Sequence, residues 1–223
     1  MRRRMSPIML VEFLFIACFA QFAQAQESHK PSVRRVVRRL SVPITSLLRP
    51  GETRLVVVYR GTPPLLAYAP RGTSEAAWLT RISRVVMRVR VVSRQSMLTP
   101  NEDWIETSVK MKILQVLKFT GRRSFHVGQE VSIMEPGGSL DLEGRQIDAI
   151  VEYGRRKEVG KEYLIFANLT SDNLLVIGYS STFEILPGGS LRWLLKTKAP
   201  DPLSESSLDS VLEEIQRHAD ADN

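Results

Sequence analysis

The sequence is poor in the residues that build disulfide, metal and nucleophilic sites, with one cysteine and three histidines among 223 residues. A single cysteine excludes a disulfide framework within one chain and any zinc or iron–sulfur site that needs several cysteines. His29, His126 and His218 show no metal-ligand spacing, and no P-loop, G-x-G-x-x-G or G-x-S-x-G motif occurs. We therefore expect no metal, no cofactor and no catalytic residue of these kinds.

The first 25 residues have the layout of a secretory signal peptide. Three arginines follow Met1, residues 8–22 are almost entirely apolar, and Ala23 and Ala25 place small residues at −3 and −1 of a cleavage site. We expect export to the periplasm or the extracellular space after cleavage at Ala25, which leaves a mature chain without cysteine. Two alternatives stay open: residues 8–22 remain as a membrane anchor, or Cys18 is lipidated.

Positive charge is concentrated in the first half of the chain. With 43% hydrophobic and 25% charged residues, the composition is that of a globular protein and excludes a disordered or collagen-like chain. Residues 30–94 contain 14 basic and two acidic residues, whereas residues 95–223 contain 14 basic and 20 acidic residues. Such asymmetry is typical of a basic segment that meets an anionic partner.

The densest basic stretch, residues 33–40, carries apolar residues at i, i+3, i+4 and i+7, which predicts a short amphipathic helix. On its polar face, a candidate contact with a membrane surface or another polyanion consists of Arg34, Arg35, Arg38 and Arg39. The alternatives are a solvated linker helix, or an extension packed against the acidic half of the chain. Nucleic acid is disfavoured as a partner because residues 30–48 hold no aromatic side chain for stacking on bases.

Two local elements precede the main β region. Residues 54–59 form one clear strand within a stretch interrupted by proline and glycine. Ser74 is a candidate N-cap for a short helix that ends at Ile82, with Ala77, Trp78 and Ile82 turned inward.

Periodicity of two then predicts strands. Residues 85–91 alternate between apolar and basic side chains, residues 100–103 read as a turn, and a long strand begins at Ile105. Its apolar phase slips near Ile113 and Leu114, which predicts a β-bulge. Further short strands are expected at residues 129–134, 146–152, 161–167, 174–179, 182–186 and 191–195.

The C-terminal residues 208–215 again carry apolar side chains at i, i+3, i+4 and i+7, which predicts one docked amphipathic helix. Short strands without interleaved helices favour an antiparallel barrel or sandwich. We therefore expect a mainly β protein: a small antiparallel OB-like barrel, with a short helix before it and one C-terminal amphipathic helix. The expected divisions are a signal peptide (1–25), a basic N-terminal extension (26–73), the barrel domain (74–200), and the C-terminal helix with a polar tail (201–223).

Residues 74–217 resemble a group of exported, uncharacterised bacterial proteins with an OB-like β-barrel. The shared motifs are Val116-Leu117-Lys118, the V-G-x-x-V of residues 127–131, Pro136-Gly137-Gly138, the VGKEYLIF of residues 159–166, and the LDSVLEEI of residues 208–215. The resemblance implies this fold and export. It implies no activity.

Two features remain as candidates for chemistry. Asp141 with Glu143, or Glu102 with Asp103, supplies a carboxylate pair in a region rich in turn residues. The string Pro-Gly-Gly-Ser-Leu occurs at residues 136–140 and 187–191, which predicts two tight turns in preference to an anion-binding nest.

The leading hypothesis is an exported, non-enzymatic binding or interaction module. Its partner would be a protein, a peptide or an anionic surface, and the basic segment would allow transient membrane contact. The alternatives are an envelope hydrolase that uses a carboxylate pair and a membrane-tethered structural protein.

Overall fold

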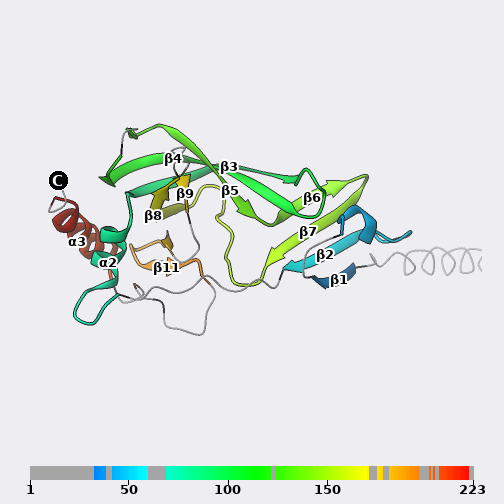
Figure 1. Ribbon diagram of the computed structural model, residues 1–223, viewed down its shortest axis with the longest axis horizontal. Helices are drawn as coiled ribbons and strands as arrows, with labels where there is room; N and C mark the ends of the chain where they lie inside the picture. The colour runs from blue at the N-terminus through cyan, green and yellow to red at the C-terminus, as the bar shows by residue number, and fades with distance from the viewer. Residues whose placement is uncertain are drawn as a thin grey trace, which may run out of the picture.

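The computed structural model describes residues 33–38, 42–59, 69–121, 124–170, 175–177, 181–195, 201, 203 and 206–220. The described strands form two sheets, and two α-helices lie at the end of the molecule opposite sheet A (Figure 1). The predicted mainly β fold is confirmed. Sheet A has the order β1 (Val33–Arg38), β2 (Arg54–Tyr59), β7 (Arg145–Val151) and β6 (Gly138–Leu142). Sheet B has the order β11 (Leu191–Trp193), β10 (Thr182–Ile185), β8 (Glu162–Leu169), β3 (Val85–Leu98), β4 (Ile105–Phe119) and β5 (Glu130–Pro136), with β9 (Leu175–Val176) paired to β8.

The hairpin of β3 and β4 runs the length of the molecule and joins its two ends (Figure 1). Its base contributes Val86 and Leu117 to the core beneath the helices, and its tip contributes Ile105 to the core under sheet A. The pairing shifts between Arg88 and Val89, where Leu114 of β4 has no partner. The predicted β-bulge is therefore confirmed, as is the turn at residues 100–103.

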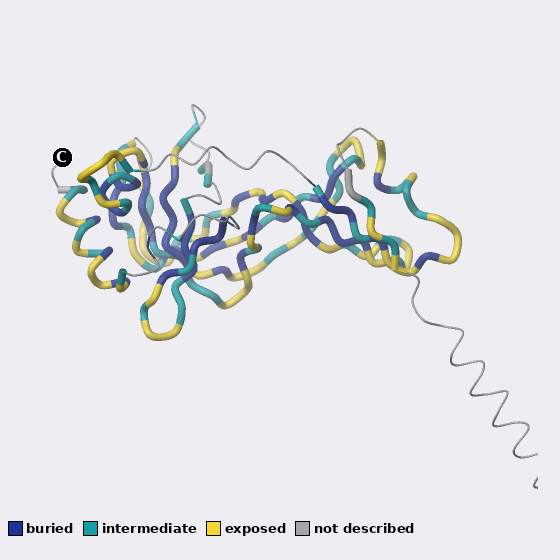
Figure 2. The backbone as a smooth tube through the Cα atoms, turned by 90° about the horizontal axis from the view of Figure 1, so that it is seen from below, coloured by how far each residue is buried: buried dark blue, intermediate teal, exposed yellow. Residues whose placement is uncertain are grey.

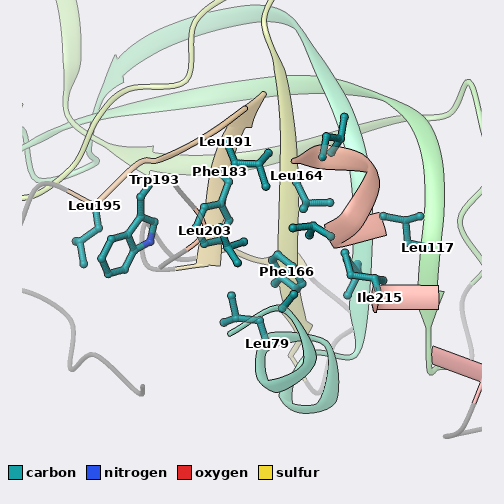
Figure 3. Close-up of a cluster of buried hydrophobic side chains, with 14 residues drawn as sticks. Leu79, Leu117, Leu164, Phe166, Phe183, Leu191, Trp193, Leu195, Leu203 and Ile215 are labelled. Carbon is teal, nitrogen blue, oxygen red and sulfur yellow. The ribbon is translucent and has the colours of Figure 1, made fainter. Parts of the chain in front are cut away.

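The helices α2 (Glu75–Ile82) and α3 (Leu208–Asp220) cover one end of sheet B. The Ser74 hydroxyl accepts the backbone N–H of Ala77, as the predicted N-cap requires. Ile82, expected to face inward, is exposed, and Leu79 is buried in its place. The apolar face of α3 is buried as predicted, beside α2 and β4, in a cluster that includes Leu79, Phe166, Phe183, Trp193 and Ile215 (Figure 3).

A bend at Gly137 carries the chain from sheet B into sheet A. Pro136 pairs with Glu106 in sheet B, and Gly138 pairs with Ala149 in sheet A. The first Pro-Gly-Gly string is therefore a passage between two sheets and not the predicted tight turn. The second string is a turn between β10 and β11, with Gly188 and Gly189 at positive φ.

Residues 33–38 of the densest basic stretch, which we call the basic segment, form β1 of sheet A. The predicted helix at residues 33–40 is wrong, because β1 pairs in parallel along the whole of β2, and β2 pairs in parallel with β7. Parallel pairing here contrasts with sheet B, in which every pair is antiparallel. Among the described strands β11 and β5 do not pair, so the predicted closure into an OB-like barrel is not confirmed.

Buried residues lie in both halves of the molecule and along the hairpin between them (Figure 2). The cluster under sheet A packs Leu55, Val57 and Ile147 against Trp104 and Ile105 of the hairpin tip. Within the described residues, no helix is long and apolar enough to cross a membrane.

Candidate functional site

A pocket of about 270 Å³ lies over the face of sheet A that points away from its core. Arg54 reaches it from the first residue of β2, Asp148 from the middle of β7, and Arg156 from the segment that follows β7. Strands β2 and β7 pair in parallel, with Val56 paired to Asp148. Arg54 is two residues before Val56 in β2. We call this the sheet A pocket; its lining is Arg54, Pro136, Asp148, Ile150, Val151, Gly154 and Arg156.

The polar side chains of the sheet A pocket form one hydrogen-bonded row. Two nitrogens of Arg54 contact the same oxygen, Oδ2, of Asp148. Nε donates a hydrogen bond to it at 2.8 Å, and Nη2 lies 2.7 Å from it. Ser139 Oγ donates to Oδ1 of Asp148 at 2.6 Å, and Arg156 Nη1 donates to Ser139 Oγ at 3.3 Å. Arg156 Nη2 also donates to the carbonyl oxygen of Ala149 at 2.6 Å. The row therefore runs from one guanidinium to the other through Asp148 and Ser139.

Asp148 is held in its ionised form. Burial favours the neutral carboxyl, but hydrogen bonds from Ser139, Arg54 and Gln146 and the charge of Arg54 outweigh burial, so its pKa lies below its usual value. A carboxylate with a lowered pKa is a weak general base near neutral pH. Its interactions stabilise the fold above the usual aspartate pKa, and this contribution is lost as the pH falls through the lower pKa of the folded state.

The two carboxylate pairs predicted from the sequence lie in or beside turns: Asp141 is in β6, and Glu143, Glu102 and Asp103 are in turns or bends. Asp141 accepts the backbone N–H of Gly144, and Glu143 has a positive φ in the same turn. Glu102, also at positive φ, accepts the hydroxyl of Thr45, and Asp103 accepts that of Thr99. None of these four carboxylates lines the sheet A pocket.

Within the described part of the chain, no group of three or more His, Cys, Asp or Glu residues could hold a metal ion. His126 contacts Ser124 Oγ at 3.1 Å through Nε2, and His218 lies in the last turn of α3. His29 lies outside the described residues.

Arg34 and Arg35 do not share one face, because successive side chains of a strand point to opposite sides. Arg34 is half-buried, pairs with Glu52 at 2.9 Å and donates to the carbonyl of Leu47. Arg35 is exposed. Arg38 ends β1 with its side chain undescribed, and Arg39 lies outside the described residues. A polyanion contact by Arg34, Arg35, Arg38 and Arg39 stays a prediction.

Lys157, Glu135 and Arg94 form a second group of charged side chains, which is largely buried. Lys157 follows Arg156 directly, is 2% exposed and donates to Oε1 of Glu135 on β5, which is 6% exposed. Arg94 Nη2 on β3 lies 3.8 Å from the other carboxylate oxygen of Glu135, beyond hydrogen-bond distance. This cluster ties the segment after β7 to sheet B, while Arg156 holds the same segment to sheet A.

The sequence analysis missed Arg54, Asp148 and Arg156. Asp148 is a charged residue inside a strand whose neighbours are apolar, and this was the one signal that a paired carboxylate lay there. Arg156 and Lys157 stand in the run Arg155-Arg156-Lys157-Glu158, which has the composition of a solvated surface segment.

No protein-family model matches this chain, and no curated protein matches it. The resemblance to exported bacterial proteins therefore has no support from relatives. The fold agrees with it at a coarser level, as a mainly β protein with a docked C-terminal helix.

Proposed function

We propose that this protein is an exported, non-enzymatic binding module that takes its ligand in the sheet A pocket. The observation that carries the proposal is the row of Arg54, Asp148, Ser139 and Arg156, which presents two guanidinium groups beside a carboxylate that is already saturated. Positioned hydrogen-bond donors over an apolar floor are typical of small-ligand sites. The signal-like first 25 residues support export, and the order of elements supports an OB-like origin for sheet B.

Hydrolysis by a carboxylate pair has less support. Such a reaction needs two carboxyl groups at a defined separation, one of them with a raised pKa. Among the described residues, Asp148 is the one carboxylate that lines the sheet A pocket, and its pKa is lowered. Glu75 does have a raised pKa, because burial outweighs the hydrogen bond from Ala69, but it lies in the first turn of α2 and not in this pocket.

Export predicts a defined N-terminus. The protein recovered from its native host is expected in a soluble fraction, beginning at Gln26, because the small residues at Ala23 and Ala25 mark the cleavage site. N-terminal sequencing and intact mass, fraction by fraction, check this. A lipidated Cys18 or an intact Met1 in the membrane fraction would contradict it and favour a membrane-tethered structural role.

A binding role predicts no turnover that depends on Asp148. We expect the wild-type protein and the Asp148→Asn variant to release no reducing ends from solubilised envelope polysaccharide, because Asp148 lacks a second carboxyl partner in the pocket and is a weak base. A reducing-sugar assay with both proteins at equal concentration measures this. Turnover by the wild type that Asp148→Asn loses would overturn the binding role in favour of the hydrolase.

A further inference from the structure

We propose that the outer edge of β1 is a docking surface for an extended, acidic segment of a partner protein, which adds a further strand to sheet A. This surface is separate from the sheet A pocket, so the inference goes beyond the function proposed above and does not depend on what the pocket binds. It rests on the position of β1 in the sheet, on its fixed backbone and on its charge.

β1 is an edge strand. It pairs with β2 along all six of its residues, and among the described strands it has no second neighbour (Figure 1). An edge strand presents a row of unpaired N–H and C=O groups, and an extended peptide can satisfy them by pairing as an additional strand. The edge therefore offers main-chain hydrogen bonds to a partner, and its side chains decide which partner is accepted.

The other edge of sheet A is covered by sheet B. It is formed by β6, which contacts the hairpin of β3 and β4. The backbone N–H of Ser139 on β6 donates to Ser96 Oγ on β3 at 3.2 Å. Among the described residues, no group outside sheet A forms a hydrogen bond with the backbone of β1. The edge at β1 is therefore the one that a partner strand can reach.

The backbone of β1 is held in place by its own contacts. Arg34 Nε pairs with Glu52 at 2.9 Å, and Arg34 Nη2 donates to the carbonyl oxygen of Leu47. Val36, on the same face of the strand, packs against the core under sheet A. Because the strand is already ordered, pairing with a partner costs less conformational entropy than it would if β1 had to form at that moment.

The charge of β1 favours an acidic segment. Its six residues include three arginines and no acidic residue. Arg35 is exposed, and no described residue forms an ion pair with it. Val33, on the same face as Arg35, is 54% exposed, so this face offers one cationic and one apolar contact. A carboxylate directly across from Arg35 would be attracted to it, and opposite charges on neighbouring strands stabilise a sheet.

A second copy of this chain is a poor occupant of the same edge. Pairing of β1 with β1 of another copy would bring three arginines from each copy into two adjacent strands that contain no acidic residue. Like charges on neighbouring strands are destabilising, and basic side chains on an edge hinder such self-pairing. The same arginines therefore exclude basic strands and admit acidic ones.

Fluorescence anisotropy of the purified protein with labelled octapeptides tests the proposal. In the acidic peptide glutamate alternates with valine, and in the basic and neutral peptides lysine or glutamine replaces glutamate. We expect the acidic peptide to bind with a dissociation constant below about 1 mM, and the other two at least about tenfold more weakly. The acidic peptide with every backbone nitrogen methylated keeps its charge but has no main-chain donors, so it should also bind at least about tenfold more weakly.

Charge reversal at the edge is the matching test on the protein. Arg35→Glu should weaken binding of the acidic peptide at least about threefold, because an exposed attraction becomes a repulsion. Arg35→Gln removes the charge without adding one and should give an intermediate affinity. The control is Arg71→Glu: Arg71 is exposed and lies in the turn before α2, at the end of the molecule opposite sheet A (Figure 1). This variant makes the same change of charge and should bind the peptide as the wild type does.

Hydrogen exchange locates the bound peptide. The amides of β1 should exchange more slowly in the complex, and those of β5, at the edge of sheet B, should be unchanged. Equal binding of the acidic and N-methylated peptides, an equal loss with Arg71→Glu, or no protection of β1 overturns the proposal.

Two further results would also overturn the proposal by identifying another occupant. A dimer in sedimentation equilibrium, with β1 protected in the absence of peptide, would identify a second copy. Binding to phosphatidylserine vesicles that Arg35→Glu weakens, with no binding of any peptide, would identify a membrane surface. Neither result bears on the sheet A pocket, whose role is tested by the Asp148→Asn assay.

Discussion

Replacing Lys157 by methionine is expected to lower the free energy of unfolding by about 3–5 kcal/mol, because breaking a buried ion pair leaves the Glu135 carboxylate buried without its hydrogen-bonded cation. Lys157 is 2% exposed and Glu135 is 6% exposed. Arg94 lies 3.8 Å from the other carboxylate oxygen of Glu135, and that oxygen has no hydrogen-bond partner among the described residues. Urea denaturation followed by far-ultraviolet circular dichroism measures the change.

The control for Lys157→Met is Lys161→Met. Lys161 is 37% exposed, and its buried partner Glu184 keeps a hydrogen-bonded cation in Arg192, so the expected loss is much smaller than that of Lys157→Met. The double variant Lys157→Met/Glu135→Gln should recover a large part of the stability, since it removes the orphaned charge. A loss no larger than that of Lys161→Met would show that Glu135 does not depend on Lys157.

Replacing Gly137 by alanine is expected to cost about 2–5 kcal/mol and to weaken the attachment of β6 to sheet A. Gly137 has φ +88°, which costs an L-residue about 1–2 kcal/mol. A Cβ there would also lie 2.7 Å from the backbone carbonyl oxygen of Ala149, and overpacking of this kind costs about 1–3 kcal/mol more. Urea denaturation gives the loss, and hydrogen exchange of the amides of β6 and β7 locates it.

The second copy of the same five-residue string provides the control. Gly188 has φ +89°, almost the same as Gly137, but a Cβ added there meets no atom within 4 Å. Gly188→Ala should therefore cost only the conformational term of about 1–2 kcal/mol. If the two substitutions cost the same, the close approach of Ala149 contributes nothing, and the explanation of the bend by steric contact is wrong.

Local signals in the sequence predicted the elements whose cause is local. The N-cap hydroxyl of Ser74 starts α2, the apolar spacing of residues 208–215 gives α3 its buried face, and the slip at Leu114 produces the bulge of β4. Each depends on residues that are close in the chain. These signals need no knowledge of the rest of the fold, and they also established the mainly β class.

The basic segment shows where a local signal was ambiguous. Four apolar residues at i, i+3, i+4 and i+7 fit a helix face, but over only eight residues the same string also suits a strand. Three of the four are valines, and β-branched side chains favour strands. Pairing of β1 with β2 along all six residues decided the outcome, and this contact lies outside what the segment itself encodes.

The candidate site depends on contacts between distant residues. Arg54 and Asp148 are 94 positions apart, and their ion pair exists because β2 and β7 lie in parallel in one sheet. The sequence analysis identified both strands but contained no information on their pairing. The same holds for Lys157 and Glu135, which are 22 positions apart and meet after the chain has passed from sheet B through β6 and β7 of sheet A.

The sequence alone therefore established the types of element and their order, because hydrophobic period and capping act over a few residues. Tertiary structure alone decided the parallel pairing of β1, β2 and β7, the bend at Gly137, and the set of charged side chains that share the pocket. The physical reason is burial: removal of Asp148 from water has a cost that depends on which cation the fold brings beside it. The pairing of β2 with β7 brings Arg54 to Asp148, which is 94 positions away in the chain.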